Sequence, residues 1–306
     1  FTSATDTFNT AVGHAAGTSV TTGTQNTFVG GLSGDDSQTG TGNTALGYQS
    51  LSGVVTGGYN TALGWGAGLA ITSGTLNTAV GTQSLFSNTV GSYNTALGEG
   101  ALYSNVDGSK SVAVGRLALY TQDPASAVDM YNVGVGYDAG GKITTGIQNT
   151  LIGGLAGDAI TTGDNNVALG YEALTANIVG DRSTALGNFA LKSQNPSSNA
   201  DMYNVAIGHN AGGDVTTGIS NTLIGGLAGD ALTDADHNVA IGQSALTTDT
   251  KGSKNTAVGH SALESQNFTT STSSYNTAIG SDSAKSITTG IANTIIGSSA
   301  GDSLTD

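Results

Sequence analysis

A short phrase, Asn43-Thr-Ala-Leu-Gly47, recurs along the whole chain and constrains its fold more than any other feature. Variants include YNTALGWGAG, NNVALGYEAL, YNVAIGHNAG and YNTAIGSDSA. The last glycine of the phrase, which we call the anchor glycine, falls at Gly13, Gly30, Gly47, Gly64, Gly81, Gly98, Gly115, Gly136, Gly153, Gly170, Gly187, Gly208, Gly225, Gly242, Gly259, Gly280 and Gly297. Thirteen of the sixteen intervals are 17 residues and three are 21. A fixed period of this kind is typical of stacked supersecondary units.

The repeat covers the chain from end to end, so we predict one repetitive body where length alone would suggest two domains. Glycine accounts for 48 of 306 residues and proline for only 2, without the Gly-x-y triplet of collagen. Aromatic residues make up 6% and charged residues 10%, so the chain cannot build a thick core. We predict a single β-solenoid fibre segment over residues 1–306, with regular turns in 1–115 and a 72-residue super-repeat in 116–306.

Each unit follows one pattern when its positions are counted from the anchor glycine as zero. Position −4 is Asn in 15 of 17 units and Ser in the others, Ser111 and Ser183. Position −3 is Thr or Val, and position −1 is Val, Ile or Leu, in every unit. Position +4 is Leu, Gly or, once, Ala284, and position +10 is usually Gly. Helical apolar spacing is absent, so the pattern favours β structure.

We expect each unit to form a short strand, a turn, a second short strand and an outer turn. Positions −3 and −1 lie on one face of the first strand, and we expect position −1 to form an apolar ladder between stacked turns. The Asn at −4 predicts a ladder of side-chain amides. The anchor glycine predicts a sharp bend or a close backbone approach, and the glycine at +10 predicts a turn with positive φ.

Three units carry four extra residues, and they begin 72 residues apart, at Gly115, Gly187 and Gly259. Their inserted loops cover 120–130, 192–202 and 264–274, and each is followed by a tyrosine at position −5. Extra residues inside a strand would shift its register. We therefore expect three outward protrusions, around Pro124, Pro196 and Phe268.

Charge and composition exclude several classes of function. The formal charge is −14 and no Lys/Arg cluster occurs, which argues against nucleic-acid binding and against attraction to anionic lipid. The absence of cysteine excludes disulfides and thiolate metal sites. No apolar run is long enough for a membrane helix, and the start lacks the features of a signal peptide. We expect the sequence to be a segment of a longer protein.

The phrases NTAIG and NVAIG, followed by small residues, resemble the head repeats of trimeric autotransporter adhesins. That resemblance implies a parallel β-roll in which three chains pack side by side. Longer phrases, YNTAIG, NTLIGGLAGDALTDADHNVAIGQSAL and GYDAGGKITTGIQNTLIGGLAGD, are similar to the repeat regions of bacteriophage tail fibre proteins. That resemblance covers almost the whole chain and implies a structural fibre on a virion.

No motif predicts catalysis or nucleotide binding. Three of the four histidines, His14, His209 and His260, fill position +1, which holds many other residue types in other units and is therefore expected to be exposed. The Gly134-Val-Gly136 and GGLAGD runs lack the following helix that a phosphate-binding loop needs. We predict no catalytic, cofactor-binding or metal residues.

Two surface features are candidates for binding. Oxygen-rich turns can hold Ca²⁺, and acidic residues gather in related turns at Asp35, Asp36, Asp158, Asp164, Asp230, Asp234, Asp236, Asp302 and Asp306, although solvated turn residues are the simpler interpretation. Exposed aromatic rings suit sugars, and Tyr48, Trp65, Tyr137 and Tyr171 share position +1. The alternative for these aromatic residues is packing against neighbouring turns.

We predict a structural shaft of a bacteriophage tail fibre, outside the cell, that spaces or presents receptor-binding surfaces for host attachment. The expected partners are two further copies of the chain, in a homotrimer that covers the Ala-rich faces, and a host glycan or protein receptor. The alternative is a bacterial surface adhesin head or extracellular fibril subunit. An enzyme such as a glycan-degrading tailspike would need paired carboxylates in a groove, which the sequence does not indicate.

Overall fold

The computed structural model describes residues 6–306, which contain strands and turns and no helix. Consistent with this, no helix in the described part of the chain could cross a membrane. The chain divides into two compact units, Phe1–Asn149 and Thr150–Asp306. Each unit is a parallel β-solenoid, which confirms the predicted fold class.

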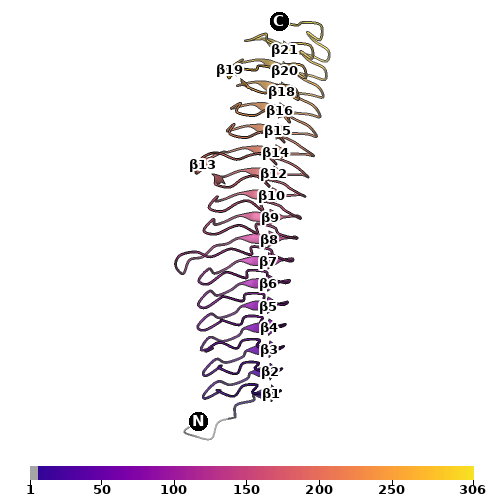
Figure 1. The fold of residues 1–306 in the computed structure, drawn as a ribbon. Coiled ribbons are helices and arrows are strands. Elements are labelled where there is room, and N and C mark those ends of the chain that lie inside the picture. The colour runs from indigo at the N-terminus through magenta and orange to yellow at the C-terminus, as the bar shows by residue number, and fades with distance from the viewer. Residues whose placement is uncertain (1–5) are drawn as a thin grey trace. The chain divides into compact units, whose positions relative to one another are not determined.

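Every repeat contributes one three-residue strand at positions −3 to −1. The first unit contains β1 (Thr10–Val12), β2 (Thr27–Val29), β3 (Thr44–Leu46), β4 (Thr61–Leu63), β5 (Thr78–Val80), β6 (Thr95–Leu97), β7 (Val112–Val114) and β8 (Val133–Val135). The second contains β9 (Thr150–Ile152), β10 (Val167–Leu169), β12 (Thr184–Leu186), β14 (Val205–Ile207), β15 (Thr222–Ile224), β16 (Val239–Ile241), β18 (Thr256–Val258), β20 (Thr277–Ile279) and β21 (Thr294–Ile296). Within each unit, successive strands pair in parallel, with equivalent positions opposite each other (Figure 1).

The predicted second strand is wrong for the ordinary turns of residues 6–306. Two-residue strands occur only beside two of the long loops, where β11 (Gly180–Asp181) pairs with β13 (Ala200–Asp201) and β17 (Gly252–Ser253) pairs with β19 (Thr272–Ser273). Elsewhere the chain turns too often to stay extended. Position −5, the anchor glycine, position +2 and position +4 all have positive φ, in every repeat.

This left-handed backbone explains a selective absence in the sequence. No Val, Ile or Thr stands at position −5, +2 or +4 in any repeat, although Thr or Val fills position −3 in every repeat. A β-branched side chain at positive φ crowds its own backbone, whereas glycine is unstrained there. The residue choice at three positions per turn therefore follows from backbone conformation.

We expect Leu76→Val to lower the free energy of unfolding by about 1–2 kcal/mol, because Leu76 has a φ of 57°. The Leu76 side chain is 47% exposed, so little core packing is lost. Leu76→Gln is the matched control, since Gln25 and Gln148 occupy the same position with positive φ. Urea unfolding of the two variants measures the difference in the free energy of unfolding. Equal losses would contradict the left-handed backbone conformation at Leu76.

The core of each solenoid is lined by position −2. From β2 to β20 every residue at −2 is buried, and most are alanine. Ala206 is 0% exposed, whereas its neighbour Ile207 at position −1 is 36% exposed. The side chains at −1 do stack into the predicted apolar ladder, but this ladder faces outward and does not line the core. The alanines at −2 are buried within a single chain, so the expectation that a trimer covers the Ala-rich faces is wrong.

The core is completed from one of two alternative positions. Eight repeats place a fully buried leucine at +4, namely Leu51, Leu85, Leu102, Leu119, Leu174, Leu191, Leu246 and Leu263. Most other repeats have glycine at +4 and a buried aliphatic residue at +7, such as Ile71, Ile143 and Ile160. A Cβ on Gly68 would lie 3.0 Å from Cδ1 of Ile71, so the two positions compete for the same space. In the leucine repeats, position +7 usually carries an amide, as at Asn88 and Asn105.

The predicted asparagine ladder is confirmed. The Nδ2 of Asn43 donates to the carbonyl of Gly57 at 3.0 Å, and its Oδ1 accepts the backbone N–H of Asn60 at 2.8 Å. These amides are buried and satisfied, so they fix the stacking distance between turns. Where Ser111 replaces the asparagine, the buried Gln122 reaches in and its Oε1 accepts from Asn132 at 2.9 Å.

Glycine serves two different purposes in the turn. A Cβ on the anchor glycine Gly47 would lie 2.4 Å from the carbonyl oxygen of Gly64, and its φ is 137°, so the predicted close approach and bend are both confirmed. At position +10, Gly40 would place a Cβ 2.5 Å from the carbonyl oxygen of Gly57. Its φ is not positive, so the predicted turn type is wrong and close stacking is the reason for glycine there.

The long loops project only at their tips. Residues 125–129, 197–199 and 269–271 are exposed, and the connection between β7 and β8 extends beyond its neighbouring turns in Figure 1. Pro124, Pro196 and Phe268, which we expected at the protrusions, are buried. The roots of the loops therefore belong to the core, and a run of only three to five residues at the tip of each loop is exposed.

Candidate functional site at the third long loop

Each long loop returns beside a basic residue of the preceding turn. In the first loop Asp129 pairs across the backbone with Ser109, which places its carboxylate 2.7 Å from Nζ of Lys110. The hydroxyl of Tyr131 donates to the same carboxylate at 3.3 Å. The hydrogen bond between Lys110 and Asp129 raises the pKa of Lys110 and lowers the pKa of Asp129.

The second loop repeats this cluster with an arginine. Asp201 pairs across the backbone with Asp181, and its carboxylate forms an ion pair with Arg182. The hydroxyl of Tyr203 donates to Oδ2 of Asp201 at 3.0 Å. A basic residue, an aspartate and a tyrosine therefore form one recurring arrangement, although its exposure to solvent limits its contribution to stability.

The third loop lacks the aspartate. Ser273 takes the equivalent place, opposite Ser253, and Lys254 is the equivalent basic residue. The Nζ of Lys254 lies 3.1 Å from the Tyr275 hydroxyl and 5.0 Å from the centre of its ring, and no described carboxylate lies within 4 Å. The hydrogen bond from Lys254 lowers the pKa of Tyr275. The cation is thus held in place without an anionic partner.

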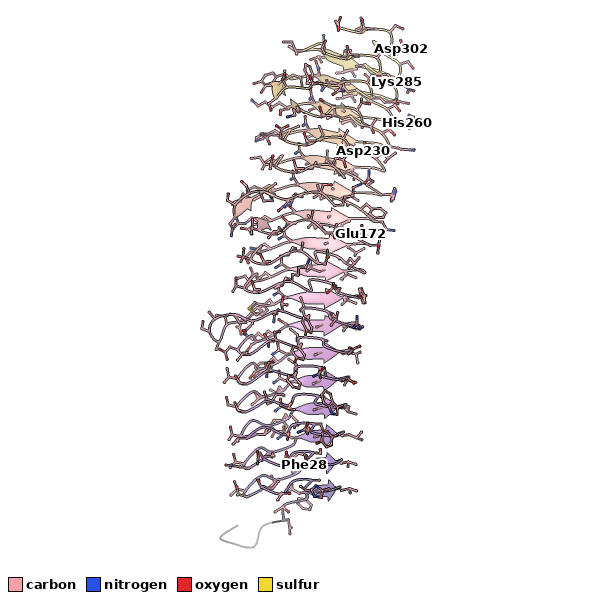
Figure 2. The ribbon with its side chains drawn as sticks, viewed as in Figure 1. Phe28, Glu172, Asp230, His260, Lys285 and Asp302 are labelled. Carbon is pink, nitrogen blue, oxygen red and sulfur yellow. The ribbon has the colours of Figure 1, made fainter. Side chains whose placement is uncertain are left out.

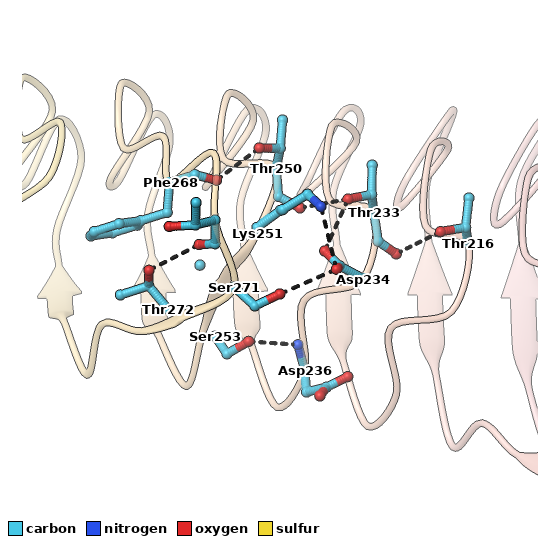
Figure 3. A network of polar contacts seen from close by, with 12 residues as sticks. Thr216, Thr233, Asp234, Asp236, Thr250, Lys251, Ser253, Phe268, Ser271 and Thr272 are labelled. Carbon is cyan, nitrogen blue, oxygen red and sulfur yellow. Dashed lines mark hydrogen bonds and ion pairs between the residues drawn. The ribbon is translucent and has the colours of Figure 1, made fainter.

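A pocket of about 340 Å³ opens at this position. Its lining residues are Asp234, Asp236, His237, Ser253, Lys254, Ser271, Thr272 and Ser273. The third loop forms one wall by reaching back over two turns, since Oγ of Ser271 donates to Oδ2 of Asp234 at 3.2 Å (Figure 3). The loop root is held by Phe268, whose carbonyl accepts from Thr250 at 2.8 Å.

The charges around the pocket offset each other. Burial acts to raise the pKa of Asp234, but hydrogen bonds from Ser271 and its own backbone, together with Lys251 at 3.5 Å, lower it overall. The Oδ1 of Asp236 accepts the backbone N–H of Ile219 at 2.9 Å. Two carboxylates, one ammonium group and the His237 side chain therefore line a cavity whose remaining lining is hydroxyl groups, and the Lys251 ammonium group pairs with Asp234 from outside the lining.

The aromatic residues predicted to contact glycan are exposed, as expected for position +1. Tyr48, Trp65, Tyr137 and Tyr171 all have about half of their surface accessible. Some of them also contact neighbouring turns: Arg116 lies 5.8 Å from the Tyr137 ring centre, and Tyr171 meets Phe189 edge to face at 5.6 Å. Those four residues do not line the pocket, and glycan contact at position +1 stays a prediction.

The acidic turns have a structural explanation. At position +5, the carboxylates of Asp35, Asp158 and Asp230 accept hydrogen bonds from the Ser or Thr hydroxyl one turn further on. Burial raises the pKa of Asp230, which lies beside the strands in Figure 2. In residues 6–306 no three His, Cys, Asp or Glu side chains gather closely enough to hold a metal ion. His260, at position +1, is exposed as expected.

The repeat pattern does not single out the pocket residues Lys254, Ser271 and Ser273, and it marks Asp234 and Asp236 only as acidic turn residues. The signal was available in the aligned loops, which end in DMY at residues 129–131 and 201–203 but in SSY at 273–275. The sequence matches no known protein-family model, and no curated protein resembles it significantly. The site must therefore be interpreted from its own chemistry.

Proposed function

We propose that the chain is a non-enzymatic structural fibre segment that assembles through its outer strand face. The observation that carries this proposal is the row of exposed aliphatic side chains at position −1. In the second unit the row includes Ile152, Leu169, Ile207 and Ile279, each at least 36% exposed. Thr and Val at position −3 flank it on the same face.

An aliphatic row of this kind favours burial against another protein surface. A second copy of the chain is the best match, because its own row has the same spacing and the same composition. The outward residues at −1, and not the buried alanines at −2, are what the assembly would cover. The resemblance to trimeric fibres supports three copies.

We further propose that this fibre is the shaft of a bacteriophage tail fibre, located on the virion outside the cell. It would separate or present the surfaces that attach to a host glycan or protein receptor. The resemblance of the repeat phrases to tail fibre repeats supports this assignment, and the same architecture would serve a bacterial adhesin head or fibril subunit. Immunogold labelling in electron microscopy distinguishes them: we expect label on phage tails, and label confined to bacterial surfaces would reject the phage assignment.

We expect the purified chain to elute as a trimer in size-exclusion chromatography with light scattering. The double variant Leu169→Asp/Ile207→Asp should dissociate it, because two charges per chain would be buried in the interface. His209→Asp is the matched control, since His209 is exposed and stands two residues after Ile207, beyond the strand. A wild-type protein that stays a monomer of 30.1 kDa would overturn the proposed assembly.

A further inference from the structure

The three long loops provide an internal comparison within one chain. Two of them complete a basic–aspartate–tyrosine cluster, and the third keeps the basic residue and the tyrosine but has Ser273 in place of the aspartate. The missing group is a carboxylate, and its place is open to the pocket that Lys254 and Ser273 line. We propose that this pocket binds an acidic sugar residue, whose carboxylate takes the place of the absent aspartate.

The ligand carboxylate would find two donors already positioned, the Lys254 ammonium group and the Tyr275 hydroxyl, which are the equivalents of the Lys110 and Tyr131 donors to Asp129. In the first loop Asp129 accepts from Nζ of Lys110 at 2.7 Å while that same ammonium group lies 3.1 Å from the Tyr131 hydroxyl. Lys254 has the same 3.1 Å contact with Tyr275. An ammonium group has three donors, so Lys254 can bind a ligand carboxylate without losing its tyrosine contact. Charge-assisted hydrogen bonds of this type are stronger than neutral ones.

The rest of the pocket suits the hydroxyl groups of a sugar. Asp234 and Asp236 offer carboxylate oxygens as acceptors, and Ser253, Ser271 and Thr272 offer hydroxyls that can donate or accept. Lys251 at 3.5 Å from Asp234 offsets the charge of that carboxylate and so reduces its repulsion of an incoming carboxylate, which leaves Asp236 as the other anion of the lining. An acidic peptide would supply the carboxylate but few of the hydroxyl donors that Asp234 and Asp236 could accept, so the lining favours a sugar.

This site goes beyond the proposed fibre role, because all of its residues belong to one chain and one compact unit. Binding is therefore testable separately from assembly. Calorimetric titration of the full chain with sodium glucuronate, glucose and acetate compares the contributions of the two parts of the ligand. Glucose lacks the carboxylate, and acetate lacks the sugar hydroxyls. We expect glucuronate to bind at least about tenfold more tightly than either ligand, because one charge-assisted hydrogen bond contributes that much. Glucose lacks the bond from Lys254 to the carboxylate, and acetate lacks the bonds from the sugar hydroxyls to Asp234 and Asp236.

Substitutions that introduce residues found at equivalent positions of the chain test the roles of Ser273 and Lys254 in binding. Ser273→Asp restores the arrangement of the first two loops, so it should pair with Lys254 and weaken glucuronate binding at least about tenfold. Lys254→Gln should weaken it similarly, and glutamine is tolerated at this left-handed position in Gln25 and Gln148. Ser273→Ala removes the hydroxyl without adding an anion and should retain binding.

Several results would overturn the proposal. Absence of glucuronate binding, or equal binding of glucose, would reject the carboxylate site. Equal binding of acetate would reject the sugar and leave a simple anion site, as would capture of an acidic peptide with matching affinity. Unchanged binding in Ser273→Asp would place the ligand elsewhere. Light scattering on the same samples reports the assembly state, so a failure of trimer formation is recognised independently.

Discussion

Ala206→Asp is expected to lower the free energy of unfolding by at least about 4 kcal/mol. Ala206 lies at position −2 in β14 and is completely buried, with Ala185 and Leu223 paired to it in the adjacent strands. A carboxylate there would be larger than the space allows and would have no cation or N–H donor to compensate its lost hydration. Because β14 pairs with β12 on one side and β15 on the other, the damage should interrupt the stack in mid-unit.

Two controls define what the loss means. His209→Asp introduces the same charge three residues away at an exposed position, and its effect should stay within about 0.5 kcal/mol. Under dilute conditions that favour the monomer, Ile207→Asp should also cost far less than Ala206→Asp, because its side chain points outward. Urea unfolding followed by circular dichroism measures all three. Similar losses for Ala206→Asp and Ile207→Asp would contradict the difference in burial, and a larger loss for Ile207→Asp would mean that the faces are reversed.

The second large effect concerns the two ways of filling the core. Ile71→Asn alone should lower the free energy of unfolding by about 3–5 kcal/mol, because it opens a cavity and buries an amide. Gly68→Leu alone should cost about 1–3 kcal/mol, since a side chain on Gly68 would meet Ile71 and Leu51. The double variant converts this repeat to the other type, with leucine at +4 and an amide at +7, and should recover to within about 1.5 kcal/mol of wild type.

The expected recovery depends on neighbours that already have the second arrangement. The next repeat contains Leu85 at +4 and Asn88 at +7, and Nδ2 of Asn88 donates to the Gly91 carbonyl at 2.9 Å. The Asn105 amide continues this row by donating to Oδ1 of Asn88 at 3.1 Å. An asparagine at position 71 would extend this row of amides by one repeat toward the N-terminus. Additive losses in the double-mutant cycle would show that the two positions do not share one space.

The sequence was sufficient to predict the solenoid, the asparagine ladder and the anchor bend, because all three depend on strict repetition. It did not reveal which strand face is inside. Alternation places −3 and −1 on the same side, but the larger residues at −1 suggested the wrong side. The reason is spatial: Leu at +4 or an aliphatic residue at +7 already fills the narrow interior, so only alanine usually fits at −2. The reciprocal choice of residues at +4 and +7 is the sequence feature that indicates a filled interior.

The candidate site could be predicted only in part. Repetition correctly indicated that position +1 is exposed, and it located the long loops. The pocket arises from a contact between Ser271 and Asp234, which are separated by two turns, and no periodic pattern encodes such a contact. The departure that matters is a single aspartate replaced by Ser273. Its meaning depends on knowing that Lys254 stands beside it.

The long-loop clusters also bear on how a repetitive chain avoids errors while it folds. Turns of equal length can stack one repeat out of place at small cost, because neighbouring repeats present almost the same surface. The loops remove that degeneracy: a slip by one turn would bring Asp129 beside Tyr93 instead of Lys110, and Asp201 beside Asn165 instead of Arg182. The misaligned stack would lose its ion pairs and leave both charges unmatched. Surface ion pairs that add little to native stability can thus still discriminate against a mistaken fold, because they favour the correct register between otherwise similar turns.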